Sequence, residues 1–305
     1  MRIRYNAEVI SIALAVFNEE SVLDRCLTSV ASFADEIVVV DGGSTDETLE
    51  IARSFGAKVI KTSNPPMFHI NKQKAIDACK HDWILQLDAD EVVSPALAKE
   101  IMQVVDNKFE PVMQGKKHDL FLLHQSNTLQ ISLQEAQKQY SADSAEIAGY
   151  FVPRLNHFLG GTLRHGGVYP DGVIRLIRKG KGRLPCISVH EQIEVDGPVS
   201  WLTADLEHYG DPSFSRYLLR ANRYTSLTAN QMSIDNLTRG VLPLLEYTLL
   251  KPATTFLSLY IRHKGILDGF PGFVFSLFSG LHHAIAYLKY EELFRSKSKS
   301  GKKSK

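Results

Sequence analysis

Residues Trp83 to Glu91 read WILQLDADE and decide the fold that we expect for this chain. A mainly apolar run, Trp83 to Leu87, stops abruptly at the acids Asp88, Asp90 and Glu91. A buried strand that ends in carboxylates is typical of an open α/β sheet, which carries its ligand site at the carboxyl ends of its strands. Asp88 and Asp90 are two residues apart, so on an extended strand both side chains would point to the same side.

Two carboxylates that leave a dry strand on one side are costly to place unless a cation receives them. We therefore interpret Asp88 and Asp90 as a metal and diphosphate site, with Mg²⁺ or Mn²⁺ as the expected ion. The alternative is an acidic turn that caps the following helix. Ser94 is the expected N-cap of that helix, and Pro95 is its expected first residue.

The residues that precede this stretch alternate between apolar strands and helices. The expected strands are 9–17, 37–40 and 58–61, and the expected helices end near residues 32, 56 and 80. Together with the strand at Trp83, this alternation favours a parallel sheet with right-handed crossovers. Ser44 and Glu47 form the expected capping box of the second helix.

Polar or acidic residues follow the strands where a nucleotide would bind. The turn after the first strand, FNEE at 17–20, lacks the glycines of a dinucleotide fold, and the sequence has no GxxxxGK[ST] phosphate loop. Asn18 and Glu19 follow the first strand instead, and Asp41 follows the second. An acid in the position of Asp41 can accept a hydrogen bond from a nucleobase or a ribose hydroxyl.

The composition is that of an ordinary globular protein: 305 residues, 44% hydrophobic, 23% charged and a net charge of +1. These totals exclude wholesale disorder and give no global field that would attract nucleic acid. Three well-separated cysteines without a CxxC pair predict a reducing compartment and no zinc site. The apolar run near residue 9 continues directly into a strand–helix pattern, so we expect no signal peptide and a cytoplasmic location.

Two domains are expected. Residues 1–210 would form the catalytic domain, with a polar, Gln-rich insertion at about 107–147 that contains a short helix from about Leu133 to Tyr140. Residues 211–305 would form a helical extension with a basic tail.

Two strands of a mixed sheet are expected around 148–153 and 172–178, with RHGGVYPD at 164–171 between them. Glycines there let the backbone approach a ligand closely, and Arg164 can pair with phosphate. The alternative is a long glycine turn.

The helical extension contains two apolar stretches, neither of which is expected to span a membrane. Val241–Ile261 contains Glu246, Lys251 and two prolines, and 269–281 is too short. The phenylalanines of 269–281 and the Lys/Arg-rich tail predict a helix that lies in the membrane interface, on the inner face of the cell membrane. The alternative is that these helices only cover the catalytic domain.

Five stretches together resemble glycosyltransferase family 2, the inverting enzymes of the GT-A fold. They are IALAVFNEE (12–20), EIVVVDGGSTDET (36–48), WILQLDADE (83–91), RHGGVYPD (164–171) and VHE (189–191). The resemblance covers roughly 9–106 and 148–290 and is to the branch with the lipopolysaccharide-core β-glucosyltransferases. It implies an α/β fold with a Rossmann-like, mixed but mainly parallel sheet, flanking helices and the C-terminal helical extension.

The resemblance also implies donor-binding residues. Asn18 and Glu19 would line the nucleotide pocket, Asp41 would bind the base, and Lys72 would lie near the donor together with Asp88. In the alternative, Asp41 begins a turn and Lys72 is a solvated helix residue. Arg164, on the glycine loop, is the further candidate for donor binding.

The remaining roles concern the metal and the catalytic base. Asp88 and Asp90 would form the DxD motif, with Asp90 the more direct metal ligand, and His208 would complete the metal shell. His208 is otherwise an ordinary histidine at a strand end. Glu191 would be the catalytic base, and Asp171 is the reserve candidate.

The implied reaction is a metal-dependent single displacement. A sugar would pass from a nucleotide sugar, with UDP-sugars favoured, to a hydroxyl of a glycan or lipid-linked acceptor of the cell-envelope or lipopolysaccharide-core type. A carboxylate must accept the proton of that hydroxyl, and the ion must neutralise the departing diphosphate. The alternatives are a sugar-nucleotide nucleotidyltransferase and a non-catalytic sugar- or nucleotide-binding module at a membrane, which would not need both Glu191 and His208.

Overall fold

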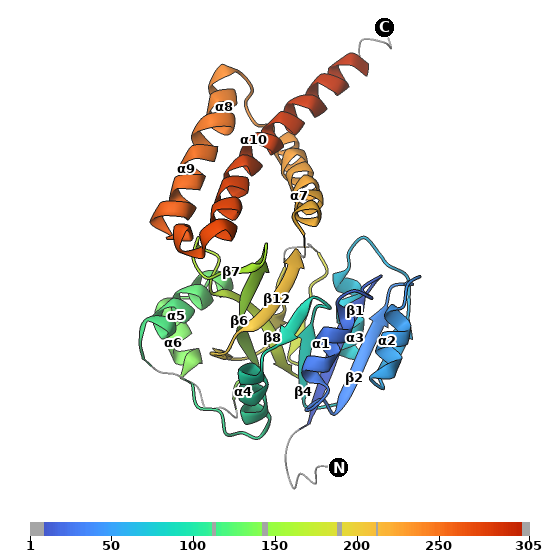
Figure 1. The fold of residues 1–305 in the computed structure, drawn as a ribbon. Coiled ribbons are helices and arrows are strands. Elements are labelled where there is room, and N and C mark those ends of the chain that lie inside the picture. The colour runs from blue at the N-terminus through green and yellow to red at the C-terminus, as the bar shows by residue number, and fades with distance from the viewer. Residues whose placement is uncertain (1–8, 112–113, 142–145, 188–190, 212, 301–305) are drawn as a thin grey trace. The chain divides into compact units, whose positions relative to one another are not determined.

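The computed structural model describes residues 9–111, 114–141, 146–187, 191–211 and 213–300. The chain forms two compact units, which Figure 1 colours along the sequence. Residues 1–155 and 170–208 make up the sheet unit, and residues 156–169 and 209–305 make up the helical unit. Val189 and His190 of the family-like stretch VHE lie outside the described residues, as do the last five residues of the basic tail.

Four parallel strands form one half of the sheet, in the order β3-β2-β1-β4. Their bounds are β1 Ile10–Val16, β2 Glu36–Asp41, β3 Lys58–Lys61 and β4 Trp83–Leu87. Each end lies within one residue of the range expected from the sequence. The parallel part of the predicted fold is therefore confirmed.

Further strands extend the sheet beyond β4 in the order β8-β6-β12-β5. Their bounds are β5 Glu91–Val93, β6 Gly149–Phe158, β8 Asp171–Arg178 and β12 Leu206–Asp211. β7 Gly161–Leu163 and β11 Val199–Trp201 pair with β6, and β9 Gly182–Arg183 pairs with β10 Glu194–Val195. The sheet is mixed, because β8 runs antiparallel to both β4 and β6, and β12 runs antiparallel to β5.

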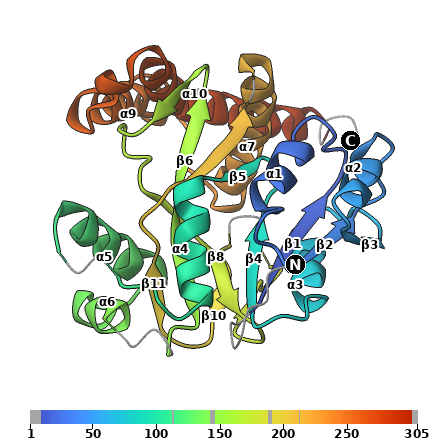
Figure 2. The ribbon, with the colours of Figure 1, turned by 60° about the horizontal axis from the view of Figure 1, so that its bottom comes forward.

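Helices cover both faces of the sheet. Their bounds are α1 Leu23–Val30, α2 Thr48–Ser54, α3 His69–Asp77, α4 Pro95–Val105, α5 Lys116–Leu129 and α6 Leu133–Tyr140. Alternate residues of a strand face opposite sides. Ile12 of β1 accordingly lies in a core with α1 and α4, while Ala13 lies in a second core with α3, α5 and α6. Figure 2 shows α1 and α4 over the same face.

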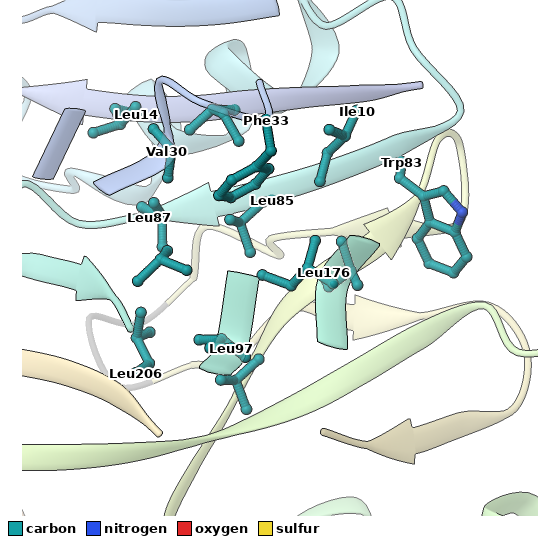
Figure 3. Close-up of a cluster of buried hydrophobic side chains, with 14 of the residues drawn as sticks. Ile10, Leu14, Val30, Phe33, Trp83, Leu85, Leu87, Leu97, Leu176 and Leu206 are labelled. Carbon is teal, nitrogen blue, oxygen red and sulfur yellow. The ribbon is translucent and has the colours of Figure 1, made fainter. Parts of the chain in front are cut away.

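The core beneath α1 and α4 holds β4 in place (Figure 3). Leu85 and Leu87 are fully buried there, in one cluster with Val30, Phe33 and Leu97. Burial of each such side chain contributes roughly 1.5–3 kcal/mol. Because β4 is packed to its last residue, the turn that carries the acids leaves the sheet from a rigid point.

Two local predictions at this level are wrong and one is confirmed. Strand β4 ends at Leu87, so Asp88 and Asp90 lie on the turn before β5 and not on an extended strand. The capping box is absent: α2 begins at Thr48, and its N-cap makes no side-chain hydrogen bond. The hydroxyl of Ser44 instead accepts a hydrogen bond from the backbone N–H of Asn18, at 2.9 Å. Ser94 does cap α4, accepting from Leu97 N–H at 3.2 Å.

The polar insertion contains more structure than expected. α6 has the predicted bounds, whereas α5 was not predicted, because its sequence is polar and lacks a clear apolar stripe. Phe121 of α5 is nevertheless buried, and its ring stacks on Trp201 at 4.2 Å between centroids. The insertion therefore packs on the strands of the sheet unit through a few large side chains.

The helical unit is built from α7 Phe214–Ile234, α8 Val241–Leu245, α9 Lys251–Leu257 and α10 Gly269–Ser300. The π turn η1 Glu246–Leu250 joins α8 to α9, and a second π turn, η2 Ser258–Arg262, extends α9, so that the four form one helical rod. η3 Gly265–Asp268 leads to α10. α10 packs against α7 and against α9. Among the described residues, no helix is long and apolar enough to cross a bilayer.

Candidate active site

A pocket of about 350 Å³ opens in the sheet unit at the carboxyl ends of β1 and β4. Five residues that the sequence singled out lie in its wall: Glu19, Lys72, Asp88, Asp90 and His208. They come from four separate segments, namely the turn after β1, helix α3, the turn after β4 and strand β12. The structure thus brings together residues that are up to 189 positions apart in the sequence.

Asp88 is held by two cations. Its Oδ1 forms an ion pair with Lys72 Nζ, and its Oδ2 lies 2.9 Å from Arg175 Nη2. Burial alone would raise the pKa of Asp88, but the charges of Lys72 and Arg175 hold it well below its usual range. Asp88 is therefore a carboxylate whose charge is already compensated within the protein.

Asp90 has a different environment. Its Oδ2 lies 3.4 Å from His208 Nε2, and the side chains are 25% and 14% exposed, respectively. The antiparallel pairing of β5 with β12 sets this contact, because it places His208 opposite Glu91, the residue after Asp90. Burial would raise the pKa of Asp90, but the hydrogen bond and charge of His208 lower it. Asp90 and His208 thus form a carboxylate–imidazole pair that faces the pocket.

This pair fits a divalent cation that takes only part of its coordination shell from the protein. No group of three or more His, Cys, Asp or Glu in the described part of the chain is arranged to hold a metal ion. Mg²⁺ is often held by one or two carboxylates together with substrate phosphates, and carboxylates also suit Mn²⁺. Asp90 and His208 supply such a set beside Asp88, and a diphosphate would supply the rest.

Comparison with known proteins identifies the enzyme class. Residues 11–138 match the sequence model of the family described as Glycosyl transferase family 2. The chain is a glycosyltransferase whose residues 11–138 match family 2.

Its similarity to a curated protein extends over most of both chains. The glycosyltransferase is 28% identical over 271 residues to the lipopolysaccharide core biosynthesis glycosyltransferase LpsC of Rhizobium meliloti (strain 1021). The aligned residues cover 87% of this chain and 85% of LpsC. It is 25% identical over 289 residues to glycosyltransferase RT0209 of Rickettsia typhi, covering 93% and 87%. Among solved structures, it matches glucosyl-3-phosphoglycerate synthase from Mycobacterium tuberculosis in complex with Mn²⁺, UDP-glucose and phosphoglyceric acid. That match has a TM-score of 0.30 and 20% identity over 40% of this chain and 50% of that one.

The glycosyltransferase also contains a buried charge network that sequence reasoning missed. Glu91 is fully buried, and its Oε2 accepts a hydrogen bond from the backbone N–H of Asp88 at 3.0 Å. Its Oε1 lies 2.8 Å from Arg175 Nη2 and 3.5 Å from Arg154 Nη1. Arg154 in turn donates twice to Asp171 Oδ2, at 2.9 and 2.7 Å. Glu91 therefore anchors the acidic turn, together with Arg175, and links it through Arg154 to the reserve base Asp171.

Asn18 and Asp41 do not line the pocket; their side chains accept hydrogen bonds from backbone N–H groups of the turn that follows β2. Asn18 has a left-handed backbone, φ 55°, and its Oδ1 accepts from the N–H of Thr45 at 2.8 Å. Asp41 is buried, and its carboxylate accepts from the N–H groups of Gly43 and Ser44, each at 3.1 Å. This geometry matches the alternative interpretation in which Asp41 begins a turn, and its role toward the base stays a prediction.

Glu191 is not one of the residues that line the pocket. Its Oε2 accepts from the N–H of Ile187 at 3.0 Å, and its Oε1 accepts from that of Cys186. Its Oε1 is also 3.3 Å from Nδ1 of buried His69, which follows the wall residue Phe68. Sequence reasoning gave no role to His69.

Arg164 belongs to the helical unit, unlike the other predicted donor-binding residues. Its guanidinium carbon lies 5.8 Å from the centroid of the Tyr169 ring, and the neighbouring His165 Nδ1 lies 2.7 Å from Asp268 Oδ1. The role of Arg164 toward phosphate stays a prediction.

Proposed function

We propose that this glycosyltransferase moves a sugar from a UDP-sugar to a hydroxyl of a glycan or lipid-linked acceptor, by a metal-dependent single displacement that inverts the anomeric carbon. One observation carries the proposal: Asp90 and His208, from distant parts of the chain, face the same pocket as Lys72 and Asp88. A nucleotide diphosphate with its cation requires such a combination of positive and negative groups.

Four residues of the pocket wall and two residues behind it would take part in binding the donor. Asp90 and His208 would hold Mn²⁺ or Mg²⁺, which when bound neutralises charge on the departing diphosphate. Lys72 would contact a phosphate oxygen, and Glu19, after β1, would line the nucleotide side of the pocket. Arg175 and Glu91 would keep Asp88 in place while the donor binds.

Glu191 is the proposed base that accepts the proton of the attacking hydroxyl. The backbone N–H groups of Cys186 and Ile187, which donate to its two oxygens, would hold the carboxylate of Glu191 in place. His69 would orient it. Asp171 is the reserve, although its pairing with Arg154 ties it to the buried network.

The acceptor is proposed from the similarity to LpsC, whose name places that protein in lipopolysaccharide core biosynthesis. We infer an acceptor of the cell-envelope type, and an enzyme that works from the cytoplasm at the inner face of the cell membrane. The sheet unit would then carry out the transfer, and the helical unit would bind the membrane.

The experiment that tests this function is a donor-hydrolysis and transfer assay. The purified chain is incubated with UDP-, GDP- and dTDP-sugars, with and without Mn²⁺, and the release of nucleoside diphosphate is measured. We expect release from one UDP-sugar that depends on Mn²⁺ and is lost in Asp90→Asn. Release of pyrophosphate from a nucleoside triphosphate and a sugar phosphate would instead identify a nucleotidyltransferase. Binding of UDP with no turnover of any donor, even with lipopolysaccharide-core acceptors present, would identify a binding module.

A further inference from the structure

The helical rod formed by α8, η1, α9 and η2, residues 241–262, has an exposed side that is mainly aliphatic. We call it the aliphatic face. Its large side chains are between 47 and 80% exposed. They are Leu242, Leu245, Leu249, Leu250, Leu257 and Ile261. The exposed side of a helix in a water-soluble domain is normally polar, so a continuous apolar stripe there marks an interaction site.

The opposite side of the rod is already used for packing within the helical unit. Tyr247 stacks on Tyr287 of α10 at 5.2 Å between ring centroids, and Phe256 meets Phe273 of α10 edge-on at 6.0 Å. Figure 1 shows α8 and α9 running beside α10. The rod therefore packs against α10 through other side chains, and the aliphatic face is not the side that forms the core of the helical unit.

The spacing along the rod explains why the face is continuous. Leu245, Leu249, Leu257 and Ile261 recur at multiples of four residues. In an α-helix such a series drifts around the axis, because one turn takes 3.6 residues. The π turns η1 and η2 are wider, with hydrogen bonds that span five residues, and they reduce that drift. The backbone and the sequence thus agree in keeping these residues on one side.

The charge of this region indicates what the face contacts. Residues 239–305 contain eleven Lys and Arg but only four Asp and Glu, a net charge of +7, whereas residues 1–238 carry −6. Arg262 and Lys264 are exposed at the end of the rod. Anionic lipid headgroups attract such a segment, and the insertion of aliphatic side chains into the membrane interface is favourable. A second copy of the chain would bring the same positive charge against it, which disfavours self-association through this face.

We propose that the aliphatic face docks the protein on an anionic lipid surface, with the rod lying in the plane of the interface. This inference identifies the surface for the membrane association included in the proposed function. The proposed membrane contact is thus residues 241–262 and not the phenylalanines of 269–281 that were expected from the sequence. Phe275 and Phe278 pack in the helical unit against the buried Phe158, Leu163 and Val274, although Phe270 and Phe273 are exposed.

Vesicle flotation tests the proposal with the full chain. The vesicles contain phosphatidylcholine alone or phosphatidylcholine with phosphatidylglycerol. The face variant is Leu249→Gln with Leu257→Gln. The matched control is Leu219→Gln with Leu227→Gln, which changes two exposed leucines of α7 in the same unit. We expect the wild type and the control to float with the anionic vesicles, less so in high salt, and the face variant to bind about tenfold more weakly or worse.

Several outcomes would overturn the proposal. One is equal flotation of the face variant and the control, and another is no flotation of the wild type. A third is self-association in sedimentation velocity that the face variant abolishes while vesicle binding is unchanged, which would make the face a dimer contact. Circular dichroism checks the fold of each variant. If the face variant does not fold, a second face variant, Leu245→Gln with Ile261→Gln, takes its place. UDP binding in solution is measured in parallel: normal UDP binding without flotation contradicts only the docking, whereas flotation without UDP binding contradicts only the donor site.

Discussion

Lys72 and Asp88 form an ion pair in the wall of the pocket, with the ammonium group against Oδ1. The other carboxylate oxygen, Oδ2, is paired with Arg175, whose side chain is only 9% exposed and is fixed by Gln86 and Glu91. The two cations therefore differ in freedom. Arg175 cannot leave without removing a cation from the buried Glu91, whereas Lys72 lies in the wall of the pocket, where we expect it to turn toward a phosphate.

Replacing Lys72 with methionine is expected to have opposite effects on two ligands. UDP affinity should fall about 10- to 100-fold, because a charge-assisted hydrogen bond of roughly 1.5–3 kcal/mol is lost. Binding of Mn²⁺ without nucleotide should be retained or strengthened, because a cation that competes for Asp88 is removed. Isothermal titration with UDP and with MnCl₂ measures both. Lys74→Met is the control, since Lys74 lies on the same helix and donates to Thr62 outside the pocket. Parallel losses of both ligands would contradict the exchange of Lys72 between Asp88 and phosphate.

Asp90→Asn should remove the metal-dependent part of UDP binding. The variant keeps the shape of the side chain but loses the charge that would hold the cation, so UDP affinity in Mn²⁺ should fall to the value measured in EDTA. Titrations of the wild type and the variant, each with Mn²⁺ and with EDTA, check this expectation. His208→Ala should reduce the same difference without abolishing it. An Asp90→Asn variant whose UDP binding still responds fully to Mn²⁺ would place the ion elsewhere.

Glu91→Gln should destabilise the sheet unit more than any surface change of the same kind. The carboxylate is fully buried between Arg175 and Arg154, and removing one partner of a buried charge cluster typically costs about 3–5 kcal/mol. Urea unfolding followed by circular dichroism measures the loss. Glu50→Gln is the control, because Glu50 is exposed on α2 and its closest cation lies 3.9 Å away on Arg53. Its effect should stay within about 0.5 kcal/mol. Similar unfolding midpoints for the two variants would mean that the network does not hold the acidic turn.

Glu36 should make the stability of the sheet unit depend on pH in acid. Burial would raise its pKa, but hydrogen bonds from the Ser11 hydroxyl, at 2.7 Å, and from the backbone N–H of Lys80, at 2.9 Å, lower it. A pKa that is lower in the folded than in the unfolded protein adds stability above the unfolded value, about 4.3, and this stability is lost as the pH falls through the folded value. Urea midpoints between pH 7 and pH 3 should therefore fall less steeply in Glu36→Gln than in the wild type. Identical slopes would show that Glu36 does not contribute.

The acidic turn shows how far sequence reasoning reaches at this site. An apolar strand that ends in acids, repeated strand–helix units and a proline after Ser94 are local signals, and they located β4 and α4 correctly. They did not show that Asp88 and Asp90 lie on a turn after the strand. Arg175 and Arg154 gave no such signal, because they approach the turn from strands β8 and β6, whose place in the sheet depends on long-range pairing.

The capping box failed for a related reason. Ser44 has the right chemistry and spacing to cap α2, but its hydroxyl accepts from Asn18, in the turn after a different strand. Local patterns give the candidates for a hydrogen bond, whereas the tertiary structure selects among them.

Glu191→Gln should abolish sugar transfer, because the amide cannot accept the hydroxyl proton. UDP binding should stay within about twofold of the wild type, because glutamine has nearly the same shape and keeps one oxygen that can accept from one of the two backbone N–H groups, that of Cys186 or that of Ile187. Transfer and donor hydrolysis are measured at saturating donor, and UDP binding is measured by titration. Asp171→Asn is the paired variant, because Asp171 is the other candidate and is 33% exposed in its contact with Arg154. If Asp171→Asn loses transfer while Glu191→Gln retains near-normal turnover, the base is Asp171. Glu191 would then only hold the segment at Cys186 and Ile187 against His69, which its contacts already do in the absence of substrate.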